Sequence, residues 1–163
     1  MPVKGTDPPR FPSGQRSYAL IPGMLESVGY LSKTDDILPM PRVLVVDDEP
    51  LIAMLVEDWL ADMQCETVGP AGTAKAALAL IDGGNLDGAI LDVSLEGHDS
   101  FAVADALRER AVPFAFATGH GRERIDERFC DAPTLCKPYD FESVRKVVET
   151  LLERGAGAAG AGR

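Results

Sequence analysis

The stretch RVLVVDDEPLIAMLVEDWL, residues 42–60, carries the strongest indication of the fold. Its first part, 43–46, is an uninterrupted run of aliphatic residues, as expected for a strand buried on both faces of a parallel sheet. The run ends at three consecutive acids, 47–49, and Pro50 then suits the first turn of a helix. Apolar residues recur at helical spacing as far as Met63, so the stretch predicts a strand, an acidic turn and an amphipathic helix.

Strand-like and helix-like segments alternate along the rest of the chain. This alternation predicts an α/β fold with a doubly wound, five-stranded parallel sheet and helices on both faces. Segment 119–133 has few apolar residues and two glycines, so we expect any helix there to be short or marginal. The remaining strands are expected near 67–68 and at 88–92, 113–118 and 134–137, and the remaining helices at about 73–81, 100–110 and 141–154.

The two ends of the 163-residue chain differ in composition from the predicted domain, 41–154. Residues 1–40 are rich in proline and lack regular periodicity, which predicts a disordered or loosely attached extension. Alternatively, translation naturally begins at Met40, and the extension is an artefact of start-site choice. The Gly/Ala-rich residues 155–163 predict a flexible tail.

Charge and composition argue against several classes of protein. The formal net charge of −10 argues against nucleic acid as a partner. No apolar run approaches the ~20 residues of a membrane span, and prolines and charges interrupt any signal-peptide core. Three cysteines without CxxC spacing predict reduced thiols in a cytoplasmic protein. Cys136 lies in a short apolar run and is expected in the core.

Polar residues stand at the predicted carboxyl ends of four strands: Asp47, Asp48, Asp92, Thr118 and Lys137. Each alone is ordinary cap or turn chemistry, but in a parallel sheet these ends share one edge, where ligands bind. Three carboxylates crowded there need a cation, and oxygen ligands favour Mg²⁺. Asp92 is placed to attack phosphorus as a nucleophile. The ion, the Lys137 ammonium and the Thr118 hydroxyl are the groups that offset the charge of an acyl phosphate.

The order of these residues on these strands resembles the receiver domain of two-component response regulators (CheY-like), over residues 41–154. The resemblance implies a flavodoxin-like strand order of 2-1-3-4-5, a cis Lys137–Pro138 bond, and a phosphoacceptor that assists its own phosphorylation and dephosphorylation rather than an enzyme. It also implies a role for each residue: Asp92 as phosphoacceptor and Mg²⁺ ligand, Asp48 as a direct ligand, Asp47 as a ligand mainly through water, the Ser94 backbone carbonyl as a further ligand, Lys137 as the phosphate-pairing cation, and Thr118 as the switch hydroxyl.

One position departs from the usual receiver pattern. Receivers commonly carry an aromatic residue three positions before the lysine, where this chain has Thr134. The stretches PFAFATG, 113–119, and KPY, 137–139, resemble the single-domain FAT GUY regulators, which lack that aromatic residue. Tyr139 is either a replacement aromatic or a residue that merely packs beside the last helix. This resemblance implies a histidine kinase of the HWE or HisKA-2 type as partner, with switching by order and disorder in 119–133.

Two further residues are predicted to tune the phosphorylated state. Ser94 lies two positions after Asp92, and His120 lies two positions after Thr118, where receivers commonly adjust hydrolysis of the acyl phosphate. We expect both to set its lifetime. His98, in a loop beside an aspartate, is expected to be solvated.

The predicted function is therefore a single-domain response regulator, because little chain remains after residue 152 for an effector domain. Its output would be contact with a downstream protein or onward phosphotransfer. One alternative is a receiver-like binding module that is never phosphorylated. Another is a phosphatase of the haloacid dehalogenase type, but that family carries its nucleophile in a DxD motif on the first strand, where this chain has DDE.

Overall fold

A parallel β-sheet forms the centre of the structure, a computed structural model that describes residues 39–160. Its strands lie in the order β2-β1-β3-β6-β7, and every neighbouring pair is parallel. Numbered by their occurrence in the chain, this is the expected order 2-1-3-4-5, so the fold prediction is confirmed. The five strands are β1 (Arg42–Val46), β2 (Glu66–Ala71), β3 (Gly88–Asp92), β6 (Phe114–Thr118) and β7 (Thr134–Cys136).

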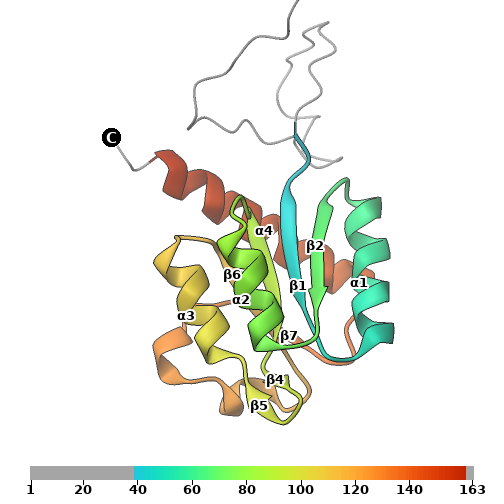
Figure 1. Cartoon of the computed structure of the whole chain (residues 1–163). Coiled ribbons are helices and arrows are strands. Elements are labelled where there is room, and N and C mark those ends of the chain that lie inside the picture. The colour runs from blue at the N-terminus through green and yellow to red at the C-terminus, as the bar shows by residue number, and fades with distance from the viewer. Residues whose placement is uncertain (1–38, 161–163) are drawn as a thin grey trace, which may run out of the picture.

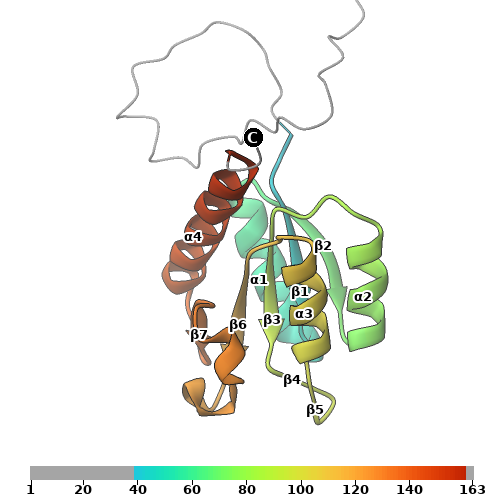
Figure 2. The ribbon, with the colours of Figure 1, turned by 90° about the vertical axis from the view of Figure 1, so that its left-hand side faces the viewer.

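Helices cover both faces of the sheet (Figures 1 and 2). α1 (Pro50–Asp62) and α4 (Phe141–Gly160) pack on one face, and α2 (Ala74–Asp82) and α3 (Phe101–Glu109) pack on the other. The sheet therefore separates two apolar cores. Every residue of β3 and β6 is buried, which explains why these strands read as continuous apolar runs rather than alternating ones.

A bulge in the β1–β2 pairing helps to position the acidic turn. The register shifts between Leu44 and Val46, and beyond it the Asp47 amide donates to the Ala71 carbonyl at 3.0 Å. Gly69 makes this path possible because its φ is +98°, and a Cβ there would lie 2.9 Å from the Ala71 nitrogen. The turn after β1 is thus tied to the end of β2.

The carboxyl ends of the strands meet at the lower edge of the sheet in Figure 1. Two small features lie there, one that the sequence did not predict and one that it predicted only in outline. The first is an antiparallel hairpin of β4 (Ser94–Leu95) and β5 (His98–Asp99), directly after β3. The second is segment 119–133, which forms two 3-10 helices, η1 (Gly121–Arg124) and η2 (Glu127–Phe129), and no α-helix. This agrees with the short or marginal helix expected there.

Two sequence expectations need correction. The predicted flexible tail is wrong for residues 155–160, which continue α4. Gly155 lets the helix pass close to the sheet, since a Cβ there would lie 3.3 Å from the Asp87 carbonyl oxygen. Cys136 is exposed rather than in the core, because β7 is an edge strand and only Leu135, at its centre, points into the core.

Other expectations concern the ends of the chain and the membrane. Residues 1–38 and 161–163 lie outside the described residues, so nearly all of the proposed N-terminal extension does too. Within residues 39–160, no helix is long and apolar enough to cross a membrane.

Candidate functional site

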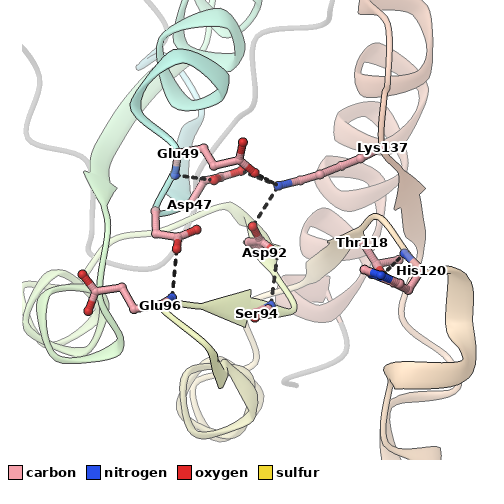
Figure 3. Close-up of polar contacts among 9 residues, drawn as sticks. Asp47, Glu49, Asp92, Ser94, Glu96, Thr118, His120 and Lys137 are labelled. Atoms are coloured by element: carbon pink, nitrogen blue, oxygen red, sulfur yellow. Dashed lines mark hydrogen bonds and ion pairs between the residues drawn. The ribbon is translucent and has the colours of Figure 1, made fainter.

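Three strand ends bring a lysine and three carboxylates together (Figure 3). The Lys137 ammonium, just after β7, lies 2.8 Å from Asp92 Oδ2 at the end of β3. It also lies 3.2 Å from Asp47 Oδ2, just after β1, and 3.2 Å from Glu49 Oε1 at the start of α1. A lysine ammonium has three donors, and all three face carboxylates here.

The centre of this cluster is withdrawn from water. Asp47 is 6% exposed and Asp92 is 7% exposed. Burial raises the pKa of Asp47, because desolvation of the carboxylate outweighs the Glu49 backbone hydrogen bond and the nearby Lys137 charge. Burial alone would lower the pKa of Lys137, but its hydrogen bond to Asp92 and the charges of Asp47 and Asp92 raise it above its usual value. Lys137 is therefore an ammonium that stabilises crowded carboxylates.

The donor set suits a hard divalent cation. Asp47, Glu49 and Asp92 each offer a carboxylate oxygen, and these oxygens lie within 4.8 Å of one another. Oxygen ligands with room for water are what Mg²⁺ prefers. Of these three, Glu49 was not assigned from the sequence. The signal for it was its place in the acidic turn, directly after the aspartate pair.

Asp48 stands apart from that group. It lines a cavity beside Asp92, described below, but its Oδ2 accepts a hydrogen bond from the Glu96 amide at 2.9 Å. This contact ties the turn after β1 to the hairpin after β3. Its expected role as a direct Mg²⁺ ligand stays a prediction.

A cavity of about 430 Å³ opens beside Asp92. Ser94, Thr118 and His120 line it together with Lys137, so the structure brings these sequence-predicted residues to one place. The full lining is Asp48, Glu49, Asp92, Val93, Ser94, Thr118, Gly119, His120, Arg124 and Lys137. Arg124, from η1, was not singled out in the sequence.

Asp92 and Thr118 hydrogen-bond to different segments, Asp92 to the hairpin after β3 and Thr118 to the start of segment 119–133. Asp92 Oδ1 accepts from the Ser94 amide at 3.1 Å, which orients the carboxylate. Thr118 is buried, and its hydroxyl donates to the Gly121 carbonyl at 3.2 Å and accepts from the His120 amide at 3.1 Å. Thr118 therefore holds the start of segment 119–133 in this conformation, and it makes no hydrogen bond to Asp92.

Tyr139 lies beside the site but packs into the core. Its ring meets Trp59 edge-on, with centroids 6.4 Å apart, and Trp59 in turn meets Phe141 edge-on at 6.2 Å. Burial raises the pKa of Tyr139 to about 12. This is the packing arrangement that was one of the two alternatives for Tyr139. His98 is exposed in β5, and the Lys137–Pro138 bond is cis, as the resemblance implied.

The chain belongs to the response regulator receiver domain family, whose model matches residues 43–153. It is 34% identical over 119 residues to the transcriptional regulatory protein TcrA of Mycobacterium tuberculosis. That match covers 70% of this chain and 47% of TcrA, so the chain spans about half the length of this relative.

Solved structures give the same family. SdrG from Sphingomonas melonis Fr1 is 45% identical, with a TM-score of 0.63, and the match covers 69% of this chain and 97% of that one. The response regulator TrrA from Thermotoga maritima, in complex with Mg²⁺ and BeF, is 30% identical with a TM-score of 0.62; the match covers 69% of this chain and all of TrrA. Receiver domains are non-enzymatic phosphoacceptors that histidine kinases phosphorylate, and they typically bind Mg²⁺ at an acidic site.

Proposed function

We propose that the protein is a single-domain response regulator whose Asp92 accepts a phosphoryl group from a histidine kinase. The observation that carries the proposal is the buried Asp92 carboxylate, 2.8 Å from the Lys137 ammonium and open to the cavity. Aspartates are almost never fully buried unless they are paired, and Asp92 is paired with Lys137 yet still lines a cavity that a second molecule can enter.

The transfer is a substitution at phosphorus. A carboxylate oxygen of Asp92 attacks the phosphorus of the kinase phosphohistidine, so an O–P bond forms and the N–P bond breaks. The imidazole leaves with the electron pair of that bond and is protonated by solvent. The Ser94 amide keeps the carboxylate oriented, and Lys137 stabilises the negative charge on the transferring oxygens.

Asp47 and Asp92 would hold Mg²⁺, with the Ser94 carbonyl and Asp48 as the further ligands that the family pattern implies. Glu49 belongs to the same group of oxygens, so this chain offers an additional acidic ligand. When bound, the ion supplies positive charge to the oxygens of the transferring phosphoryl group. The ion and Lys137 would then together offset the negative charge of a site that is already acidic before transfer.

The output is proposed to pass through segment 119–133. Thr118 would turn its hydroxyl from the Gly121 carbonyl toward the phosphoryl group, and this would release the start of η1. Ser94 and His120, at the cavity wall, would set the lifetime of the acyl phosphate. The downstream event is contact with another protein or onward phosphotransfer.

The FAT GUY type is supported by the PFAFATG stretch, and a single-domain protein is supported by the match to nearly the whole SdrG chain. A BeF3-activated conformation of SdrG is also 45% identical to this chain. From the resemblance to the FAT GUY regulators, we infer a kinase of the HWE or HisKA-2 type as phosphodonor.

Intact-mass spectrometry tests the phosphoacceptor. The protein is incubated with acetyl phosphate or phosphoramidate, with and without Mg²⁺, and in parallel with purified HWE-type and HisKA-2-type kinases. We expect one added phosphoryl group that requires Mg²⁺ and is lost in Asp92→Asn but kept in Asp62→Asn, an exposed control at the end of α1. A wild type that stays unmodified with every donor would contradict the proposal and favour the non-phosphorylated binding module.

A further inference from the structure

A second cation lines the cavity beside Asp92. Arg124 belongs to η1 and shares the cavity wall with Thr118 and Lys137. Its neighbours in the segment are engaged: Arg122 donates to the Cys130 carbonyl at 2.6 Å, and Arg128 pairs with Asp105 at 3.2 Å. Within residues 39–160, the exposed Arg124 side chain has no hydrogen bond and no ion pair.

Lys137, by contrast, is fully committed. Its three donors serve Asp47, Glu49 and Asp92, the same three carboxylates that crowd the site. Phosphorylation exchanges the single negative charge of the Asp92 carboxylate for the charge of about −1.5 to −2 on a phosphoryl group, so the site becomes more negative and gains acceptor oxygens. The Lys137 donor that now serves Asp92 can turn to these oxygens, but the other two can do so only by releasing Asp47 or Glu49. The phosphorylated site therefore calls for a further positive group.

We propose that Arg124 binds the phosphoryl group on Asp92 and closes η1 over it. A guanidinium presents planar, paired donors that match the oxygens of a phosphoryl group, and this geometry favours binding of a doubly charged oxyanion. Arg124 is in position at the cavity wall and gives up no existing hydrogen bond or ion pair within residues 39–160. The inference rests on the proposed function, since the ligand is the group that Asp92 would carry.

The local structure lets η1 move at small cost. In this conformation the Thr118 hydroxyl holds the Gly121 carbonyl, at the first residue of η1. When Thr118 turns toward the phosphoryl group, that contact is lost, and the residue three positions further on is Arg124. The two events are linked, because the hydroxyl that releases η1 and the guanidinium that recaptures it bind the same ligand. Arg124 thus gives segment 119–133 its own contact to the phosphoryl group.

Beryllofluoride, a stable mimic of the phosphoryl group, tests this on the full chain with saturating Mg²⁺. Its apparent Kd is measured from the amide resonances of β3 in the wild type, Arg124→Gln, Arg124→Lys and Arg110→Gln. Arg110 is the control, because it lies directly after α3, pairs with Asp82 at the end of α2 and does not line the cavity. We expect Arg124→Gln to weaken binding about ten-fold, as for loss of a hydrogen bond to a charged group. Arg124→Lys should recover part of this, and Arg110→Gln should bind as the wild type.

Amide exchange gives the structural readout. Beryllofluoride should slow amide exchange in 119–126 of the wild type and leave it unchanged in Arg124→Gln. The sheet amides should exchange at the same rates in both proteins. Equal affinity in the wild type and Arg124→Gln, or equal weakening in Arg124→Gln and Arg110→Gln, would overturn the role of Arg124 and leave the phosphoacceptor intact. A wild type that binds no beryllofluoride would overturn both.

Discussion

The two walls of the cavity are held in different ways. One wall carries Asp92, which is buried at the end of β3 and bonded to the Ser94 amide. Asp47, just after the adjacent strand β1, is buried next to Asp92 and bonded to the Glu49 amide. The other wall is formed by Gly119, His120 and Arg124, which belong to segment 119–133, and the two 3-10 helices of this segment have mostly exposed side chains. The carboxylate wall cannot move without disturbing the sheet.

The second wall has one deep anchor. Phe129, at the end of η2, is fully buried among Phe101, Phe114 and Phe116, with ring centroids 5.6–5.9 Å away. The guanidinium groups of Arg108 and Arg128 lie over its ring, each 4.7 Å from the centroid. The stretch between Thr118 and this anchor depends on surface contacts, so it can rearrange while the core stays folded. The residues proposed for phosphoryl transfer and those proposed for the switch therefore lie in parts of the domain that differ in local stability.

Removing the anchor should have the largest effect. Phe129→Ala is expected to lower the free energy of unfolding by about 3–5 kcal/mol, because it leaves a cavity beside three aromatic rings. Urea unfolding measures the loss, and Phe129→Leu is the control, with an expected loss of about 1 kcal/mol. If Phe129→Ala and Phe129→Leu unfold at similar urea concentrations, Phe129 is not the anchor of the second wall.

Removing the lysine should unbalance the first wall. Lys137→Met leaves Asp47 and Asp92 buried beside one another without their cation, and the free energy of unfolding should fall by about 3 kcal/mol without Mg²⁺. Added Mg²⁺ should restore more stability to this variant than to the wild type, since the ion supplies the missing charge. Thermal unfolding across a Mg²⁺ titration checks both statements. Lys146→Met, at an exposed site on α4, should change neither quantity.

A surface contact of the second wall should matter less and only locally. Arg122 donates to the carbonyls of Cys130 and Ala132, which joins η1 to the end of η2. Arg122→Gln should cost about 1 kcal/mol and speed amide exchange in 119–132 without changing exchange in the sheet. Uniformly faster exchange over the whole domain would mean that the two walls are not independent.

The cysteines compare the buried core with the exposed surface. Burial raises the pKa of Cys65 to about 11, so at pH 8 it remains a protonated thiol, which is unreactive. Cys130 and Cys136 are exposed. Iodoacetamide at pH 8 should therefore label two thiols rapidly and the third only in denaturant, as peptide mass spectrometry will show. Rapid labelling of Cys65 in the folded protein would reveal that the core beside α1 opens readily.

Much of the site followed from local pattern. The sequence pointed to four residues because each stands at the end of a predicted strand, and parallel strands bring such ends to one edge. They are Asp47, Asp92, Thr118 and Lys137. Glu49 was harder to assign, since an acid in the first turn of a helix has an ordinary explanation in the helix dipole. Arg124 gave no signal at all, because a lone arginine in a polar segment looks like any solvated residue.

Local sequence patterns were enough to predict the alternation of strands and helices, the buried strands and the polar residues at their ends, because burial on both faces leaves a continuous apolar run. They misjudged Cys136 and residues 155–160, where an edge strand and a close helix–sheet contact depend on neighbours far along the chain. The contact of Lys137 with Asp92, 45 residues away, and its further contact with Glu49 became evident only from the folded domain. The physical reason is that strand order and side-chain contacts come from packing of the whole domain, which no local pattern encodes.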